Sequence, residues 1–305
     1  MNEPKFAYFE GKIVPFGDAK ISVATHAFNY GTAVFGGMRA YWNEDTKKLF
    51  AFRPWDHFHR LLYSARLLCM EVPYNEESLI QIMLDLLRAE AWKQDIYIRP
   101  TFYKSDTGIG VRVHNLKDDL TMWSMPFQKY IQNDTNAHVT VSSWRRIDDN
   151  VIPARGKISG AYVNSVLIKT DAARSGFDEA LVLNQNGHVS EGSAMNVFMV
   201  RDGTLITPPV TENILEGITR RSVMEFARNE LNLPVVERPI DRTEIFICDE
   251  FFMTGTAAQV AAVTKVDHRP IGAGVMGPVT VRLRELFDDA ARGRSEKYRH
   301  WNMEI

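Results

Sequence analysis

The stretch IPARGKISGAYVNSVLIK, residues 152–169, places a lysine, Lys157, between an extended segment and an expected helix. Gly156 and Gly160 flank this lysine and allow another molecule to approach the backbone closely. A lysine that is partly desolvated at such a position loses its preference for the ammonium form, so its amine can form a Schiff base with an aldehyde. A surface lysine with its amine in water is the simpler interpretation, and other parts of the chain must decide between the two.

Two further segments have the residue types that bind an anion. Gly217 precedes an expected helix, so the backbone amides of Ile218 and Thr219 and the Thr219 hydroxyl point toward whatever lies at the helix N-terminus, a site that suits phosphate. The run MTGTAAQV, residues 253–260, offers a second group of amides and hydroxyls. Ordinary capping and a tight turn explain either segment alone. A phosphorylated cofactor that carries an aldehyde would use both segments and the lysine.

An acidic residue, Glu191, stands in the strand-like sequence VSEGSAMNVF. A buried carboxylate needs a cationic or protonated partner, because burial of an uncompensated charge is costly, and a pyridinium nitrogen would serve. A solvent-exposed glutamate at the edge of a hairpin is the alternative interpretation.

Composition narrows the class of protein. The 305 residues suffice for one large or two medium domains, and 36 basic against 38 acidic residues, spread along the chain, indicate no nucleic-acid surface. Glu3 and Lys5 stand where a signal peptide needs an apolar core, and residues 21–38, the longest run without charged side chains, are too polar for a membrane span. Two cysteines cannot form a disulfide framework. We expect a cytoplasmic protein.

Other common cofactor sites are disfavoured. His57 and His59 lie two residues apart on an expected helix, where their side chains diverge, so we expect no metal site. The GIGV stretch lacks the third glycine of a dinucleotide-binding motif and does not open a helix.

The pattern of elements predicts a mixed α+β protein. Short β-like runs alternate with helices expected at 54–70 and 77–92 in the first part of the chain. Polar residues at 128–137 predict an interdomain linker. Beyond it, helices are expected at 159–177, 217–231 and 278–292, with strands between them and hairpin turns at Asn186-Gly187 and Asp202-Gly203.

These motifs, in this order, resemble the fold type IV aminotransferases that use pyridoxal 5′-phosphate, and most closely the branched-chain amino acid aminotransferases. The likeness covers nearly the whole chain and is carried by HAFNYGTAVFGGMRAYW, IYIRPTFYKSDTGIGV, IPARGKISGAYVNSVL, VSEGSAMNVF, TPPVTENILEGITRRSV, FFMTGTAAQV and GPVT. It implies a two-domain fold similar to that of D-amino acid aminotransferase. The smaller α/β domain would comprise residues 1–127, and the cofactor-binding domain, with a mixed β-barrel-like core, residues 138–305.

The resemblance also implies the activity and the cofactor site. The amino group would move between leucine, isoleucine or valine and 2-oxoglutarate, in a ping-pong reaction through a Schiff base of pyridoxal 5′-phosphate on Lys157. Lys157 would then shuttle the substrate proton, Glu191 would keep the pyridine nitrogen protonated, and Tyr162 would donate to the ring phenolate oxygen. The remaining cofactor-binding residues implied are Arg60, Leu215, Ile218, Thr219 and Thr256.

Substrate recognition is assigned to the first domain. Tyr97 and Arg99 alternate along a strand, so their side chains face the same side. The resemblance implies that this pair and Arg39 allow one pocket to accept first an apolar side chain and then the distal carboxylate of glutamate. The other substrate-binding residues implied are Phe35, Gly37, Phe127 and Tyr130 in the pocket wall, Thr256 and Ala257 at the α-carboxylate, and Tyr30 and Val111 from a neighbouring subunit. The active form would be a homo-oligomer, a dimer or larger.

One departure from the family pattern concerns the pocket. Family members commonly have Phe-Glu-Gly-Ile-Arg where this chain has Phe35-Gly36-Gly37-Met38-Arg39, so a carboxylate beside the arginine is missing. We therefore hypothesise that Gly36 broadens the substrate range. The alternatives of the same fold are a D-amino acid transaminase, an (R)-amine transaminase and an aminodeoxychorismate lyase, and a non-catalytic binder is the alternative from another class. Arg99 beside Tyr97, together with Arg39 and GIGV, favours the branched-chain class.

Overall fold

The computed structural model describes residues 3–305. The chain divides into two compact units, and we describe each unit separately. The first unit contains the chain up to Gln128 together with Gly156–Ala161 and Asp289–Ile305, and the second contains Lys129–Arg155 and Tyr162–Asp288. The lysine segment thus belongs to the first unit, although the sequence suggested a C-terminal domain running from 138 to 305. The domain limits inferred from the sequence stay a prediction.

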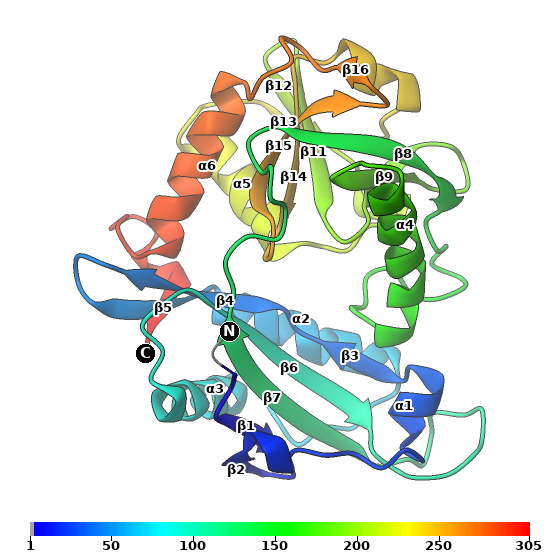
Figure 1. Cartoon of the computed structure of the whole chain (residues 1–305), viewed down its shortest axis with the longest axis vertical. Helices are drawn as coiled ribbons and strands as arrows, with labels where there is room; N and C mark the ends of the chain where they lie inside the picture. Colours follow the sequence, from blue (N-terminus) through cyan, green and yellow to red (C-terminus); the bar gives the residue numbers. More distant parts are fainter. Residues whose placement is uncertain (1–2) are drawn as a thin grey trace. The chain divides into compact units, whose positions relative to one another are not determined.

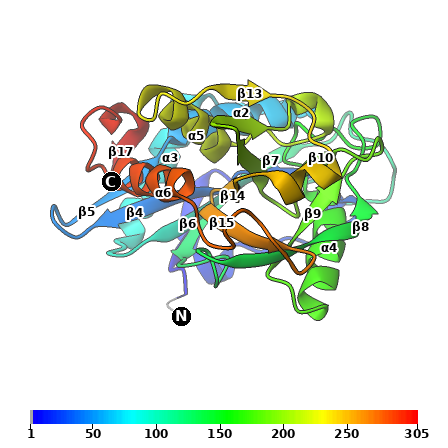
Figure 2. The same ribbon diagram turned by 90° about the horizontal axis from the view of Figure 1, so that it is seen from above.

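The first unit is built on an eight-stranded sheet in which every adjacent pair is antiparallel. The strand order is β17-β5-β4-β6-β7-β1-β2, and β3 also pairs with β6. Figure 1 labels β1 to β7 of this sheet, and Figure 2 labels β17. The strands are β1 (Phe6–Phe9), β2 (Lys12–Pro15), β3 (Ala33–Phe35), β4 (Met38–Asn43), β5 (Lys48–Phe52), β6 (Ile96–Lys104), β7 (Asp118–Pro126) and β17 (Asn302–Glu304).

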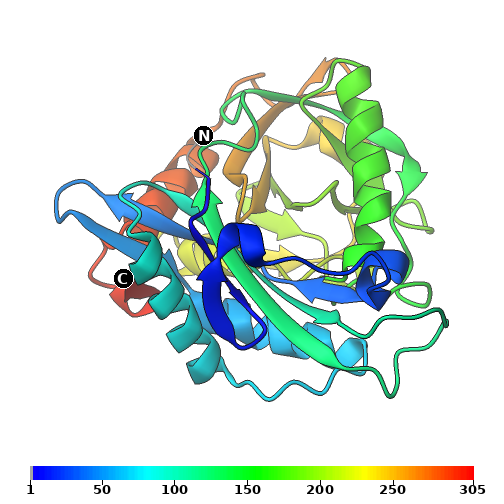
Figure 3. The same ribbon diagram turned by 60° about the horizontal axis from the view of Figure 1, so that its bottom comes forward.

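Two amphipathic helices, α2 (Pro54–Leu67) and α3 (Glu76–Glu90), cover this sheet. They contact each other, α2 contacts β3, and α3 contacts β1 and β7 (Figure 3). Pro54 starts α2, where its fixed φ suits the first turn. The α3 N-terminus carries a capping box, in which the Asn75 side chain accepts from the Ser78 amide while the Ser78 hydroxyl accepts from the Asn75 amide. The helices predicted at 54–70 and 77–92 are therefore present with shifted ends.

A nine-stranded mixed sheet forms the second unit, in the order β10-β9-β8-β15-β14-β11-β12-β13, with β16 paired to β15. Three pairs are parallel, namely β8–β9, β8–β15 and β12–β13. The other pairs are antiparallel. The strands are β8 (Ala137–Arg145), β9 (Glu179–Leu183), β10 (Val189–Gly192), β11 (Asn196–Arg201), β12 (Thr204–Thr207), β13 (Val235–Glu237), β14 (Glu250–Gly255), β15 (Gln259–Val266) and β16 (Arg269–Pro270).

Helices α4 (Tyr162–Arg174) and α5 (Ile218–Asn229) flank this second sheet at different strands (Figure 2). α4 contacts β8 and β9, whereas α5 contacts β13 and β14. A large apolar cluster, which includes Val139, Leu181, Val197 and Phe251, fills the core. The predicted mixed α+β fold is confirmed.

The remaining helices are short or terminal. They are α1 (His26–Tyr30), α6 (Pro278–Ala291) and the 3-10 turns η1 (Phe16–Asp18), η2 (Ser159–Ala161), η3 (Val210–Glu212), η4 (Arg242–Ile247) and η5 (Arg299–Trp301). Glu250 accepts hydrogen bonds from the amides of Val279 and Thr280 and so caps the start of α6. Within residues 3–305, no helix has both the length and the apolar composition needed to cross a bilayer.

The polar segment 128–137 is held by specific contacts in the second unit. Ile131 is buried in the apolar core, and Arg284 donates to Asp134 at 2.6 Å. Burial raises the pKa of Asp134, but the hydrogen bonds from Arg284 and Lys129 outweigh it and hold the pKa below its usual value. This polar segment is therefore held in place by the contacts of its side chains, although its sequence has low β propensity.

Candidate active site

Lys157 is fixed by its backbone to β3 and α2. Its amide donates to the Ser64 hydroxyl at 3.2 Å, and its carbonyl accepts from the Phe35 amide at 3.0 Å. Ser64 in turn donates to the carbonyl of Arg60, one turn earlier on α2. The lysine side chain is half-buried, and its Nζ lies 5.0 Å from the centre of the Phe35 ring. The aromatic ring of Phe35 therefore takes the place of part of the hydration shell of the amine.

The glycines around Lys157 permit a close approach of backbones. The Gly160 amide donates to the Gly31 carbonyl at 3.1 Å, and a Cβ on Gly31 would lie 2.8 Å from the Gly160 Cα. A Cβ on Gly156 would lie 2.8 Å from a methyl of Leu67. The glycine pattern that surrounds the lysine in the sequence thus serves packing inside the first unit, and it fixes the segment that carries the amine.

One face of β4 and β6 gathers the side chains predicted to recognise substrate. Arg39 pairs with Tyr97 across the two strands, and Arg99 follows Tyr97 by two residues, so all three point to the same side. Arg99 donates to the Tyr97 hydroxyl at 3.0 Å, and its guanidinium carbon lies 4.4 Å from the centre of the Phe35 ring. Phe35 therefore contacts both the amine of Lys157 and the guanidinium of Arg99.

Further residues continue this face. The ring of Phe127 lies 5.5 Å from that of Tyr97, and Arg39 donates to the Phe127 carbonyl at 3.0 Å. A Cβ on Gly37 would lie only 2.3 Å from the Tyr97 hydroxyl oxygen, so a glycine is needed there for the observed position of Tyr97. Phe35, Gly37, Arg39, Tyr97, Arg99 and Phe127 are thus brought together in the first unit.

Gly36 does not leave an empty space. A Cβ at this position would lie 2.6 Å from Cγ of Pro100, and the Gly36 amide donates to the Pro100 carbonyl at 2.8 Å. These contacts lie at the break between β3, which ends at Phe35, and β4, which begins at Met38. The geometry gives no support to a pocket widened by Gly36, because the proline ring occupies the volume that a side chain would fill.

Tyr30 contacts the exposed loop that carries Val111. The Gly110 amide donates to the Tyr30 hydroxyl at 3.3 Å, and His26 Nε2 lies 2.9 Å from the Gly110 carbonyl oxygen. Val111 itself is 94% exposed and Ile109 fully exposed. The loop is therefore anchored to α1 and presents two apolar side chains to solvent.

In the second unit, Glu191 is a buried carboxylate with several donors. It lies on β10 and is 3% exposed. Arg146 Nη2 lies 2.8 Å from its Oε1, and Oε2 accepts from Asn196 Nδ2 at 3.2 Å and from the Leu215 amide at 3.1 Å. These donors balance and orient the negative charge, so the alternative of a solvent-exposed hairpin glutamate is excluded.

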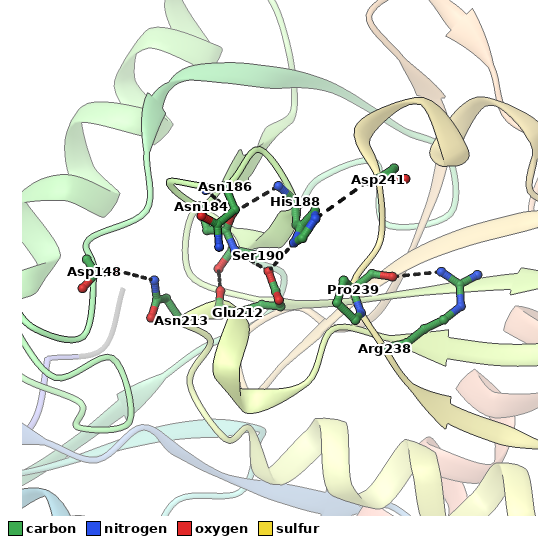
Figure 4. Close-up of polar contacts among 10 residues, drawn as sticks. All are labelled: Asp148, Asn184, Asn186, His188, Ser190, Glu212, Asn213, Arg238, Pro239 and Asp241. Atoms are coloured by element: carbon green, nitrogen blue, oxygen red, sulfur yellow. Dashed lines mark hydrogen bonds and ion pairs between the residues drawn. The ribbon is translucent and has the colours of Figure 1, made fainter.

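A polar network ties the strand of Glu191 to the segment before α5 (Figure 4). Asn184 and His188 both contact the side chain of Glu212, His188 at 3.1 Å. The Ser190 hydroxyl donates to the Glu212 carbonyl at 2.6 Å. Since Ser190 precedes Glu191 and Glu212 lies three residues before Leu215, this network fixes the two segments that meet at the carboxylate.

The N-terminus of α5 presents backbone donors. Gly217 is its N-cap and offers no side-chain cap, and the amides of Ile218 and Thr219 cannot bond within the helix because they belong to its first turn. A Cβ on Gly217 would lie 2.0 Å from Asn196 Oδ1, so a glycine is required here. The helix thus begins where the sequence predicted, and the binding of an anionic group by its amides stays a prediction.

The other predicted residues have these positions. Thr256 and Ala257 form the turn between β14 and β15, and Tyr162 opens α4. Tyr130 lies 5.6 Å from Lys169 Nζ, measured from its ring centre. Leu215 uses its amide to hold Glu191, a more specific role than the sequence indicated. No group of three His, Cys, Asp or Glu side chains in the described part of the chain is arranged to hold a metal ion.

Sequence reasoning missed Arg146 and Asn196, which both bind the Glu191 carboxylate, and Asp95, which lies 3.5 Å from Arg39. Arg146 follows the strand-like run VTVSSW, and its partner is 45 positions away, so no local pattern could pair them. For Asp95 there was one signal, since it alternates with Tyr97 and Arg99 along the chain and so belongs to the same face.

Comparison with known proteins agrees with this geometry. The family model for class IV amino-transferases matches residues 33–266. A probable branched-chain-amino-acid aminotransferase of Aquifex aeolicus is 46% identical over 97% of this chain and 95% of its own length. The branched-chain-amino-acid aminotransferase of Escherichia coli K12 is 35% identical over 97% of this chain and 96% of its own length.

Solved structures agree as well. The branched-chain aminotransferase of Thermoproteus uzoniensis, solved with norvaline, gives a TM-score of 0.95 at 37% identity, with 99% of both chains covered. The enzyme of Thermobaculum terrenum in its PLP form gives a TM-score of 0.94 at 36% identity, covering 99% of this chain and 98% of that one. The chain belongs to the class IV aminotransferases, within the branched-chain amino acid aminotransferase group of fold type IV.

Proposed function

We propose that the protein is a transaminase that uses pyridoxal 5′-phosphate to move the amino group between leucine, isoleucine or valine and 2-oxoglutarate. The observation that carries this function is the contact of Phe35 with both the Lys157 amine and the Arg99 guanidinium. This contact supports a single substrate position that lies beside the amine of Lys157, the guanidinium of Arg99 and the apolar ring of Phe35. The relatives named for branched-chain aminotransferase activity support the same assignment.

The residues present fit the proposed cofactor. Pyridoxal 5′-phosphate has an aldehyde, a ring nitrogen that must keep a proton, and a phosphate; when bound, it supplies an electron sink for the charge that develops at the substrate Cα. Lys157 offers an amine for the aldehyde, and Glu191 offers an ion-paired carboxylate for the ring nitrogen. The amides of Ile218 and Thr219 offer an anion site for the phosphate. Arg60, Tyr162, Leu215 and Thr256 complete the proposed cofactor-binding set.

Lys157 acts as the acid and base of the proposed reaction. Its backbone is held on both sides by Ser64 and Phe35, so the amine moves only by rotation of its own side chain. This restriction suits a group that takes a proton from the substrate Cα and returns it to a neighbouring atom. Arg146, Asn196 and the Leu215 amide orient the Glu191 carboxylate, which would hold a proton on the ring nitrogen of the bound cofactor.

Substrate recognition is divided between two kinds of group. Phe35, Phe127 and Tyr97 provide apolar surface for a branched side chain, and Tyr130 is proposed to extend that wall. Arg99 and Arg39 provide the charge that a distal carboxylate needs, with Arg99 oriented by the Tyr97 hydroxyl at 3.0 Å. The amides of Thr256 and Ala257 are proposed to hold the α-carboxylate.

We infer a homo-oligomer, a dimer or larger, in the cytoplasm. Support for the oligomer comes from the anchored loop that exposes Ile109 and Val111 beside Tyr30, because exposed apolar side chains on a fixed loop favour contact with a partner. Tyr30 and Val111 are proposed to complete the substrate site of the neighbouring subunit. The two free cysteines, Cys69 and Cys248, support a reducing compartment.

A half-reaction screen tests the function. The protein loaded with pyridoxal 5′-phosphate is mixed with single amino donors, and the conversion of the cofactor to its amine form is followed by absorbance. Branched-chain L-amino acids and L-glutamate should convert it, whereas D-amino acids and (R)-amines should not. Conversion by D-amino acids alone would contradict the proposal. The Lys157→Ala variant should lose conversion by several orders of magnitude, and the exposed Lys265→Ala variant should retain it.

A further inference from the structure

Arg39 is a buried cation with few hydrogen-bond partners. It is 2% exposed, and its Nε has no hydrogen-bond partner within residues 3–305. Besides its bond to the Phe127 carbonyl, its guanidinium carbon lies 4.9 Å from the centre of the Tyr41 ring and 5.4 Å from that of Phe127. A guanidinium in such surroundings requires a negative charge nearby, because burial of an uncompensated charge is costly.

Asp95 supplies this charge. Its Oδ2 lies 3.5 Å from Arg39 Nη2, an ion pair too long for a strong hydrogen bond. The same carboxylate is bound more firmly by Arg292, which donates to both oxygens at 2.9 Å. The Trp42 amide also donates to Oδ1 at 2.9 Å. Arg292 therefore fixes the carboxylate, and Arg39 receives only a share of its charge.

The strand register places this cluster beside the proposed substrate face. Arg39 stands opposite Tyr97, and Asp95 precedes Tyr97 by two residues, so Asp95 projects to the same side as Tyr97 and Arg99. The Asp95 carboxylate is thus shared between the guanidinium groups of Arg39 and Arg292. Gly36 stands where the family pattern has a glutamate, and the structure instead provides Arg39 with the carboxylate of Asp95, the residue directly before β6.

We propose that Asp95, held by Arg292, is a specificity-determining residue that sets how far the charge of Arg39 is neutralised. The inference rests on the proposed function, in which one pocket takes an apolar side chain in one half-reaction and a distal carboxylate in the other. With an apolar side chain bound, Asp95 is the counter-ion of Arg39. With a dicarboxylate bound, the long ion pair leaves enough positive charge for the distal carboxylate to compete.

Two substitutions are expected to move specificity in opposite directions. Asp95→Asn keeps the shape of the side chain but removes the counter-ion, so the ratio of kcat/KM for glutamate to that for leucine should rise about tenfold. Arg292→Gln leaves Asp95 to pair with Arg39 alone, so the same ratio should fall about tenfold. If the cluster had only a structural role, both variants would lower kcat/KM for glutamate and for leucine by the same factor.

Binding of unreactive acids provides a readout that needs no turnover. Glutarate and 4-methylpentanoate differ in the group that would face Arg39, and each can be titrated into the cofactor-loaded enzyme by calorimetry. The ratio of their dissociation constants should shift toward glutarate in Asp95→Asn and toward 4-methylpentanoate in Arg292→Gln. The matched control is Asp118→Asn, which breaks the buried Asp118–Lys104 pair on the opposite face of β6 and should leave the ratio unchanged.

The outcomes separate the inference from the proposed function. If the wild-type enzyme transaminates leucine and glutamate, the proposed function stands. If the two variants then leave both ratios unchanged, or move them in the same direction, the inference about Asp95 is overturned. A wild-type enzyme without this activity overturns the function, and the glutarate titration then still decides the inference. If Asp95→Asn does not fold, Arg292→Gln decides alone, since a fallen ratio supports the role of Asp95 and an unchanged ratio overturns it.

Discussion

Arg146 holds Glu191 through an ion pair of 2.8 Å, and the same guanidinium donates through Nε to the carbonyl of Asn213 at 3.1 Å. One side chain at the end of β8 thus fixes both the carboxylate on β10 and the loop that leads into α5. Because two of the proposed cofactor contacts, at Glu191 and at the helix start, lie on these segments, Arg146 sets their separation.

Loss of Arg146 should destabilise the protein even without cofactor. Arg146→Met leaves a carboxylate that is 3% exposed without its cationic partner, which typically costs about 3–5 kcal/mol. Urea unfolding of the cofactor-free protein measures this cost. Arg146→Lys should recover part of it. Arg145→Met is the control, because Arg145 is exposed, and it should cost less than about 0.5 kcal/mol. Equal stabilities of the two Met variants would contradict the role of Arg146.

Gly37→Ala should impair the recognition of the dicarboxylic substrate. The added methyl group would lie 2.3 Å from the Tyr97 hydroxyl oxygen, so Tyr97 must move and Arg99 loses its hydrogen bond. We expect the KM for glutamate to rise about tenfold, with a smaller change for leucine, since a displaced hydrogen-bonding group costs most for the charged substrate. Steady-state kinetics measure both values. The control is Gly17→Ala, where no atom lies within 4 Å of the added carbon. Equal effects of Gly37→Ala on both substrates would argue against this role of Tyr97.

Acid should weaken the second unit through Glu244. The hydrogen bond from Arg238 holds the pKa of Glu244 below its ordinary value of 4.5, against the effect of burial, and Arg201 contributes a further bond at 2.6 Å. A carboxylate with a lowered folded-state pKa stabilises the protein above pH 4.5 and loses that contribution as pH falls through the folded-state pKa.

The measurement is the free energy of unfolding between pH 7 and pH 3. Glu244→Gln should lower it by about 1–3 kcal/mol at pH 7 and by less at acid pH, because the protonated wild type has lost the same interaction. Glu10→Gln, at an exposed glutamate of the first unit, should leave the pH dependence unchanged. A gap between wild type and Glu244→Gln that stays constant down to pH 3 would rule out this linkage.

The sequence predicted the local features of the site well. Lys157 between two close-packing glycines, Glu191 on a strand, and a helix that starts after Gly217 all depend on short-range patterns, namely spacing, alternation and capping. The shared face of Tyr97 and Arg99 follows from the two-residue repeat of a strand.

What the sequence could not predict are contacts between distant segments. Arg146 and Glu191 are 45 positions apart, and Arg292 reaches Asp95 across 197 positions, so strand register and helix packing decide these pairs. The break between β3 and β4 could not be predicted for a similar reason, because it lies where Pro100 of the distant strand β6 fills the space beside Gly36. The assignment of 156–161 to the first unit follows from the bond between Phe35 and Lys157, which no local pattern encodes.

The most direct test of the central claim is to find the residue that binds the cofactor covalently. The protein loaded with pyridoxal 5′-phosphate is reduced with borohydride, digested, and its peptides are sequenced by mass spectrometry. The phosphopyridoxyl group should appear on Lys157 alone and should be absent from the Lys157→Ala variant. Its presence on another lysine, or its absence from the wild-type protein, would contradict the account.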